Sequence, residues 1–327
     1  MWGTKVFTAT STGNARLLIV HDDGGQDFIA YLTDHVKDLE DALTQYGAVL
    51  FRSFSTGPET MLSAAFGVLY GAALPYIYRS TPRTAAGEGV YTATEYPPSS
   101  EIVLHNENAY QRDWPMRLGF HCIKPAETGG QTTIADLTDI TTKIGANVVD
   151  EFRRRRILYV RNYNGYLDLP WQVVFQTNEK AVVESYCTEH ELTYRWITDD
   201  HLRTEQVCQG AAIHPLTGQD LWFNQAHLFH VSGLGDEVAS SMLAAFPEDE
   251  LPRNAYFGDG GRIDPTVLDH VRTAFAASAH DVDWVTGDVL VLDNMQTCHG
   301  RRAFKGSRRV LLSMGLPYSS IGNRRTS

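Results

Sequence analysis

Apolar positions recur at helical spacing close to the N-terminus. Between Phe28 and Tyr46 the aliphatic residues lie three and four apart, at Ile29, Leu32, Val36, Leu39 and Leu43. This period places them on one face, so the segment predicts an amphipathic helix that packs on a core. Gly47 is typical of a helix C-terminus, and the apolar run at 48–51 predicts a buried strand.

Further helices and short strands are expected along the rest of the chain. A second helix is expected after Pro58, a third at 137–156, and two more at 237–246 and Pro265–Ala277. Short apolar runs predict strands at 118–123, 132–135, 157–160, 172–175, 211–214, 221–224, 287–293 and 309–314. This pattern favours a mainly β fold with α decoration, a jelly-roll barrel with flanking helices.

The segment at about 79–100 has no apolar period and is rich in Ser, Thr, Pro and Gly. Loops of this length in compact domains are commonly lids or binding segments, the alternative being a plain surface excursion. The 327 residues would allow two domains of about 150 residues each, but neither a linker nor a repeat is visible. We therefore expect one domain over 1–327, with helical N-terminal support at about 25–75 and a lid-like loop at about 79–100.

Composition narrows the classes of function. The chain is 43% hydrophobic and carries a formal net charge of −11, which excludes a phosphate-neutralising nucleic-acid partner and favours a small-molecule substrate. The N-terminus has no apolar run of signal-peptide length, and the uncharged stretch at 64–78 is broken by Pro75. A soluble protein without a membrane partner is expected.

Cys122, Cys187, Cys208 and Cys298 lie far apart and form no CxxC pair. Their spacing suggests neither a zinc ribbon nor a disulfide framework, and it is typical of a protein in the reducing cytoplasm.

A candidate metal site is divided between the two halves of the chain. His105 and Glu107 follow an apolar run, and His299 lies near the other end. Residues i and i+2 of a strand share a face, so His105 and Glu107 can reach one metal while Asn106 points away. Two imidazoles and one carboxylate suit iron(II) and leave positions open for a cosubstrate and dioxygen. With twelve histidines in the chain, such a pair alone also arises by chance.

The late arginines strengthen this hypothesis. If 2-oxoglutarate chelates the metal, its far carboxylate needs a cation, which the planar fork of an arginine supplies best. Arg309 is placed for that role, ten residues after His299. Arg308 would point to the opposite face of the same strand, so at most one of them enters the site. Thr132 or Thr133 could add a hydroxyl donor.

Several segments in order resemble the SyrP-like amino-acid hydroxylases of the taurine dioxygenase and clavaminate synthase superfamily. The resemblance covers about Tyr76 to Pro317 and is carried by residues 80–84, 91–97, 104–107, 125–136, 222–227, 292–294, 299–301 and 308–310. It implies a double-stranded β-helix, iron(II) and 2-oxoglutarate. It also implies that His105, Glu107 and His299 bind the metal and that Thr132 and Arg309 bind 2-oxoglutarate, whereas the family often has proline where Thr133 stands.

Relatives in this branch hydroxylate unactivated carbons of amino acids, commonly in nonribosomal peptide pathways and sometimes on a carrier protein. Iron halogenases of the superfamily lack the carboxylate that Glu107 provides, so the resemblance favours hydroxylation. A second arginine, which binds an anionic group in some relatives, is replaced by Ser313. This favours a tethered or masked substrate, with Arg301 and Arg83 as substitutes for that arginine, and Asn224 comes first among further candidates for substrate contact.

Other interpretations stay open at this point. Desaturation or epoxidation would use the same site. A non-catalytic metal-binding jelly roll would need a fourth protein ligand at the metal. A docking module of a synthetase assembly would rest on the run Arg153 to Arg156, although basic residues at a helix C-terminus are also favoured by the helix dipole alone.

Overall fold

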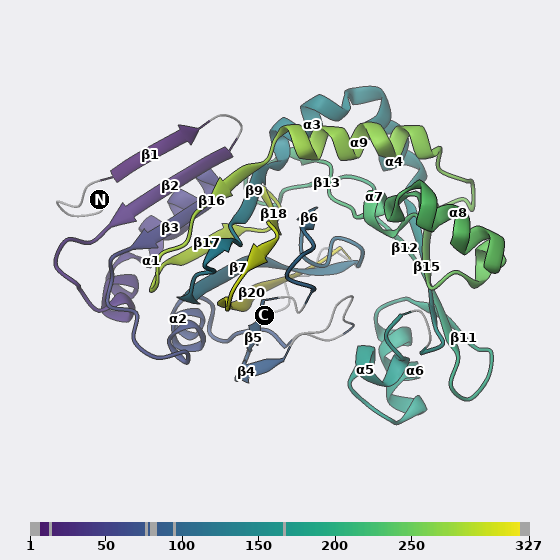
Figure 1. Ribbon diagram of the computed structural model, residues 1–327, viewed down its shortest axis with the longest axis horizontal. Coiled ribbons are helices and arrows are strands. Elements are labelled where there is room, and N and C mark those ends of the chain that lie inside the picture. The colour runs from purple at the N-terminus through teal and green to yellow at the C-terminus, as the bar shows by residue number, and fades with distance from the viewer. Residues whose placement is uncertain are drawn as a thin grey trace.

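The computed structural model describes residues 7–12, 15–75, 78, 84–93, 96–165 and 168–320. Its largest element is an eight-stranded sheet, the main sheet (Figure 1). The strand order is β1 (Phe7–Thr12), β2 (Ala15–His21), β3 (Ala48–Arg52), β17 (Val289–Asp293), β7 (Asp113–Lys124), β20 (Arg309–Ser319), β5 (Val90–Thr92) and β4 (Ala85–Gly87).

Two four-stranded sheets accompany it. The minor sheet has the order β16 (His280–Val282), β9 (Thr132–Asp136), β18 (Thr297–Arg301) and β6 (Ile102–His105). The third sheet has the order β11 (Thr193–Trp196), β12 (Leu202–Cys208), β10 (Ile157–Tyr163) and β15 (Arg253–Phe257). Two short pairs join β13 (Ala212–Ile213) to β14 (Asp220–Leu221) and β19 (Phe304–Lys305) to β8 (Thr128–Gly129).

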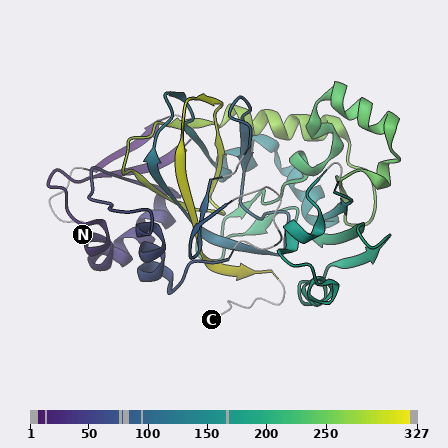
Figure 2. The same cartoon turned by 60° about the horizontal axis from the view of Figure 1, so that its bottom comes forward.

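The helices form two groups. The purple N-terminal helices and the green helix-rich segment are on opposite sides of the strands in both views (Figures 1 and 2). The helices are α1 (Phe28–Tyr46), α2 (Met61–Tyr70), α3 (Leu137–Ile144), α4 (Ala146–Arg155), α5 (Trp171–Phe175), α6 (Lys180–Glu189), α7 (Ala226–Phe229), α8 (Asp236–Ala245) and α9 (Pro265–Ala277), with 3₁₀ turns η1 (Val231–Leu234) and η2 (Glu248–Glu250). None of the helices described has the length and apolar character that a membrane span requires.

The main sheet is buried on both faces, and strand alternation divides its side chains into two cores. Val49 and Phe51 of β3 pack with α1 and α2, together with Leu311 of β20. Ala48 and Leu50 point the other way, and their core includes residues of the minor sheet such as Ile134 and Val282. The main and minor sheets therefore enclose a common apolar interior.

Local signals explain most element boundaries. Helix α1 ends at Gly47, whose φ of 72° is the left-handed conformation that glycine adopts without strain. Helix α9 has the predicted bounds, because Asp264 caps the amide of Thr266 and Pro265 occupies the first turn. The mainly β fold with helical decoration is confirmed.

Three local predictions differ from the structure. The predicted helix at 137–156 is divided into α3 and α4 at Gly145, which has a φ of 89°. The predicted strand at 172–175 is the helix α5, whose N-terminus is set by Pro170. Within the described part of the lid-like loop, β4 and β5 form a hairpin that pairs with β20 at the edge of the main sheet.

Candidate metal centre

The three predicted metal ligands meet between β6 and β18. His105 and His299 are directly opposite each other in the antiparallel pair, and their ring centroids are 4.5 Å apart. His299 Nε2 lies 3.9 Å from Glu107 Oε2, and one ligand atom from each of the three residues lies within 4.8 Å of the others. Glu107 and His299 are buried, whereas His105 is partly accessible. Among the described residues, no fourth metal-binding side chain joins this group.

A β-bulge and a glycine bring the two histidines together. Two residues of β6, Val103 and Leu104, face the single residue Gly300 of β18, so the register shifts by one position. A Cβ on Gly300 would lie 2.4 Å from the carbonyl oxygen of Ile102, and any larger residue would push the strands apart. Glycine at this position therefore keeps the ligand-bearing strands in close contact.

Glu107 is held by a turn and not by a strand, because β6 ends at His105. Asn294 braces this turn: its Oδ1 accepts from the Glu107 amide at 2.8 Å, and its Nδ2 donates to the Glu107 carbonyl at 2.9 Å. Asn106 donates to the Asn294 carbonyl, and its own carbonyl accepts from Gln225. These bonds connect the carboxylate ligand to the loop that precedes β18.

Asn294 is itself held in place by a buried charge network. The neighbouring Asp293 forms an ion pair with Arg117 at 2.7 Å and a hydrogen bond with His214 Nε2 at 3.0 Å, and it accepts from the amides of Met295 and Gln296. Burial alone would raise the pKa of Asp293, but Arg117 and His214 hold it below its usual range. The loop that supports the metal ligands is thus fixed by an ionised carboxylate.

The donor set fits a divalent iron. The Nδ1 atom of His105 lies 2.9 Å from the Val103 carbonyl, which places the proton on Nδ1 and directs Nε2 towards a metal. Two imidazoles and one carboxylate occupy three positions of an octahedron and leave three for exchangeable ligands. A closed structural site would use a fourth protein ligand, and the described residues offer none.

A small cavity of about 30 Å³, the inner cavity, adjoins the two histidines. Its lining includes His105, His299, Thr132, Arg301 and Arg308, and none of the lining residues that the structure describes carries a carboxylate. Arg308 donates from Nε to the Gly130 carbonyl and forms no ion pair with any described residue. Burial, together with neighbouring Arg301, lowers the pKa of Arg308 to about 10, so it is still charged at neutral pH. The inner cavity thus contains two guanidinium groups without an acidic partner in its lining.

The structure corrects the prediction that Arg309 faces this site. Arg309 is exposed, forms an ion pair with Glu59, and does not line the inner cavity. The reason is strand alternation: Leu312 lines the inner cavity and Leu311 packs with the helices, so Arg308 has the inward parity and Arg309 the outward parity. Residues 310–314 are all apolar except Ser313. Both alternating sets of side chains therefore suit a buried face, and the sequence alone did not reveal which set faces the inner cavity.

The remaining predicted residues have different positions. Thr132 lines the inner cavity and accepts from Trp284 Nε1 at 3.0 Å. Arg301 also lines it, but its terminal nitrogens donate to the carbonyls of Tyr96, Pro97 and Ser100. Asn224 lines none of the described cavities, because its amide is bonded to the Gly210 carbonyl and the Ala226 amide. Arg83 lies outside the described residues.

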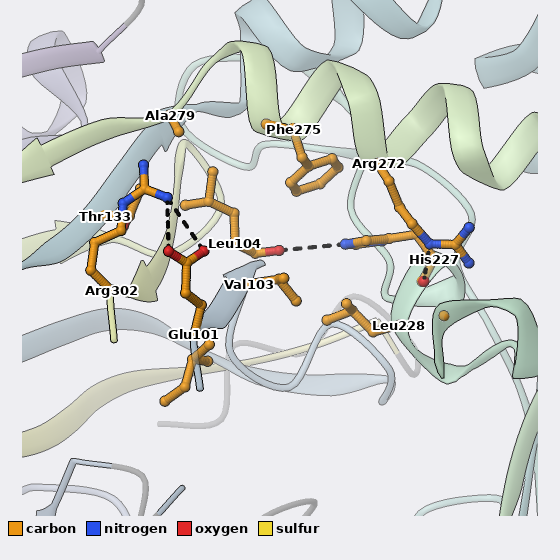
Figure 3. Close-up of a pocket in the computed structure, with 13 residues that line it drawn as sticks. Glu101, Val103, Leu104, Thr133, His227, Leu228, Arg272, Phe275, Ala279 and Arg302 are labelled. Atoms are coloured by element: carbon orange, nitrogen blue, oxygen red, sulfur yellow. Dashed lines mark hydrogen bonds and ion pairs between the residues drawn. The ribbon is translucent and has the colours of Figure 1, made fainter. Parts of the chain in front are cut away.

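A second cavity of about 300 Å³, the outer cavity, lies on the other face of the minor sheet (Figure 3). Thr132 lines the inner cavity, and the next residue, Thr133, lines the outer one. The walls include Leu104, Leu228, Phe275 and Ala279, with the Arg302 to Glu101 ion pair at one side and Arg272 at the other. The ring of His227 also lines the outer cavity, and its Nε2 atom lies 3.4 Å from the Leu104 carbonyl oxygen.

Sequence reasoning missed Arg308 as the inward arginine and Asn294 as the brace. Asn294 belongs to the motif at 292–294, so its position was noted but its role was not. The side chain of Gln225 also supports the turn that contains Glu107, through its bond to the Asn106 carbonyl. These roles depend on contacts between segments that are far apart in the sequence. Residue spacing within a single sequence does not reveal such contacts.

Comparison with known sequences identifies a family and a relative of this chain. The family model described as taurine catabolism dioxygenase TauD, TfdA family matches residues 18–314. The dapdiamide synthesis protein DdaC of Enterobacter agglomerans is 40% identical over 276 residues, which cover 84% of each chain.

Solved structures show the same fold. The structure of a putative alpha-ketoglutarate-dependent taurine dioxygenase from Burkholderia xenovorans covers 98% of this chain and 96% of its own, with a TM-score of 0.56 and 14% identity. PvcB, an Fe, alpha-ketoglutarate dependent oxygenase, has a TM-score of 0.53 and 14% identity. The match covers 95% of this chain and 90% of PvcB. The chain therefore belongs to the TauD, TfdA family and is an oxygenase that uses iron(II), 2-oxoglutarate and O₂.

Proposed function

We propose that the protein hydroxylates an unactivated carbon of an amino acid or amino-acid-derived substrate in natural-product biosynthesis. The observation that carries this proposal is the complete triad of His105, Glu107 and His299, in which the carboxylate is present and buried against His299. Similarity to DdaC, a protein named for dapdiamide synthesis, supports a biosynthetic role. Desaturation and epoxidation are the alternatives within the same chemistry.

The scaffold of this proposal is a double-stranded β-helix formed by the main and minor sheets. Support comes from the apolar interior that the two sheets share and from the solved structures with the same fold. We also propose that the whole chain acts as one oxygenase domain.

Arg308 is the residue we assign to the far carboxylate of 2-oxoglutarate, in place of Arg309. Arg308 lines the inner cavity, whereas Arg309 is already neutralised by Glu59. A dianionic cosubstrate would provide the negative charge that the lining of the inner cavity lacks. The hydroxyl of Thr132 accepts from Trp284, which leaves its proton available for the same carboxylate.

Bound iron(II) would supply the oxidation, in which one atom of O₂ enters a substrate C–H bond to give an alcohol and the other enters 2-oxoglutarate, which becomes succinate and CO₂. The chain's own residues position the reactants. His105, Glu107 and His299 would hold the metal, Arg308 and Thr132 would orient the cosubstrate, and Phe120 packs 5.2 Å from the His299 ring and shields it from water.

Paired arginine variants test the assignment. Arg308→Leu should raise the KM for 2-oxoglutarate by about 10- to 100-fold, since charge-assisted hydrogen bonds contribute about 1.5–3 kcal/mol. Arg309→Leu, the matched control, should change it by less than about threefold. Succinate release at varied 2-oxoglutarate measures both values, and a larger effect of Arg309→Leu would reverse the assignment.

The substrate we favour has no free carboxylate, as in an amino acid tethered to a peptidyl carrier protein. Ser313 is fully buried and donates to the Gly89 carbonyl, and Arg301 is bonded to loop carbonyls. Neither is therefore available for a substrate carboxylate. Docking through the arginine run gains no support, because Arg153 pairs with Asp150 and Asp220, and Arg155 with Glu151 and Asp259.

A substrate screen tests the reaction. Free amino acids and the same amino acids loaded on carrier proteins would be incubated with iron(II), 2-oxoglutarate and O₂, with mass spectrometry of the products. Hydroxylation adds one oxygen atom and desaturation removes two hydrogen atoms. Exclusive turnover of free amino acids would contradict the tethered-substrate proposal, and product lacking added oxygen would contradict hydroxylation.

A further inference from the structure

A groove lined by cations opens beside the inner cavity. This basic groove has a volume of about 690 Å³, and its described lining residues include Lys124, Arg301, Arg308 and Arg309 and no Asp or Glu. In a chain with a net charge of −11, such a lining is a local exception. Lys124 is exposed and makes no ion pair with any described residue, so its charge is directed at solvent.

The basic groove and the inner cavity are neighbours with a shared wall. Ala93, Arg301 and Arg308 belong to the lining of both. The inner cavity, at about 30 Å³, has room for little more than one water molecule, which occupies about 30 Å³ in the liquid. A five-carbon diacid held near His299 must therefore extend towards the groove.

The charged side chains become more buried from the basic groove towards the inner cavity. Lys124 and Arg309 are exposed, Arg308 is half-buried, and Arg301 is buried. Cations at the mouth of a cleft raise the association rate of an anion by about 10-fold or more at low ionic strength. The outer cavity offers no comparable path, because Arg302 is paired with Glu101 and Asp281, and Arg272 with Asp269.

We propose that 2-oxoglutarate reaches the iron, and succinate leaves it, through the basic groove, with Lys124 as the cation that first attracts either dianion. The proposal rests on the assignment of Arg308 to the cosubstrate. Arg309 contributes less to this attraction, because Glu59 neutralises it.

Charge variants test the attraction. At low salt, Lys124→Glu should slow association of 2-oxoglutarate with the iron-loaded protein by about 3- to 10-fold, and the loss should shrink as salt is raised. Glu59→Gln, which releases the charge of Arg309, should accelerate association. Lys37→Glu, the same charge reversal on the distant helix α1, should leave the rate unchanged. Stopped-flow binding without oxygen measures all three, and equal effects of Lys124→Glu and Lys37→Glu would overturn the role of Lys124.

Blocking the path tests the route itself. All four native cysteines are buried, so a thiol reagent will label an introduced surface cysteine selectively. Ser307 is exposed and lines the basic groove, Ala276 is exposed and lines the outer cavity, and Ser240 is exposed on α8 and lines neither. A bulky maleimide on Ser307→Cys should slow 2-oxoglutarate association at least tenfold, and 2-oxoglutarate should in turn slow the labelling.

The same label on Ser240→Cys or Ala276→Cys should have no effect on association. Native association rates in labelled Ser307→Cys, or a block in labelled Ala276→Cys, would overturn the route. The route and the cosubstrate assignment can fail separately. If Arg308→Leu does not weaken equilibrium binding of 2-oxoglutarate, the assignment fails; if it does but the Ser307 label is without effect, only the route fails.

Discussion

The two faces of the minor sheet differ in chemistry although they are formed by the same strands. On the inner face, Thr132, His299 and Arg308 border a small cavity whose described lining residues include arginines but no carboxylate. On the outer face, Thr133 belongs to a larger apolar cavity whose arginines are paired with carboxylates. Alternation along a strand is enough to separate them. The candidate metal ligands thus lie beside the smaller cavity, so cavity size alone would direct attention to the other face.

Loss of a predicted metal ligand on the inner face should reduce turnover far more than a change on the outer face. His299→Ala should abolish tight iron binding and lower 2-oxoglutarate turnover by at least about a thousandfold, because the metal supplies the oxidation. Thr133→Ala, on the outer face of the neighbouring strand, should change turnover by less than about threefold. Iron content and succinate release measure both. Substantial turnover in His299→Ala would contradict the assignment of the triad.

Low pH should destabilise the folded protein because His227, in the lining of the outer cavity, is buried in its neutral form. Burial lowers the pKa of His227 to about 3, well below the usual value of 6.5. The unfolded chain then binds the proton that the folded chain rejects, so stability is complete above about pH 6.5 and decreases as the pH falls towards 3. The contribution of His227 is up to about 1.4 kcal/mol per pH unit in that interval.

Urea unfolding of the metal-free protein between pH 7 and pH 4.5 measures this slope. His227→Gln retains a hydrogen-bond donor but cannot be protonated, so its stability should depend less steeply on pH than that of the native chain. Identical slopes for the two proteins would show that His227 is not the titrating group.

Filling the outer cavity should have the smallest effect. Ala276→Leu places an apolar side chain from α9 into the cavity and should increase the free energy of unfolding by about 0.5–1 kcal/mol. Ala277→Leu is the matched control, because Ala277 is exposed on the same helix but does not line the cavity. Neither change should affect the KM for 2-oxoglutarate. A rise in KM with Ala276→Leu alone would mean that the two faces are functionally coupled.

Much of this arrangement could be predicted from the sequence, where one signal decides the structure. Helices α1 and α9 follow from apolar period and capping residues, and the three metal ligands follow from residue type and motif order. The direction of Arg308 could not be predicted, because the apolar residues that follow it satisfy either strand parity. The helix α5 was missed because a short apolar run fits a strand and a helix equally well.

His105 and Glu107 lie close together as predicted, but not for the predicted reason. Spacing suggested two residues on one strand, but the strand ends at His105 and Glu107 follows in a turn. Long-range hydrogen bonds to Asn294 place the carboxylate, and they depend on a residue far away in the chain. The cytoplasmic location stays a prediction that rests on the four cysteines, which are free and buried.

The bonds of Asn294 have a consequence for how the site is assembled and lost. A single amide side chain grips both backbone groups of Glu107 and also donates to the Pro115 carbonyl of β7, while its own backbone precedes the strand of His299. The turn cannot drift away from the second histidine without breaking several bonds at once. Loss of the Asn294 side chain should therefore displace Glu107 relative to His299, even though neither residue is itself changed.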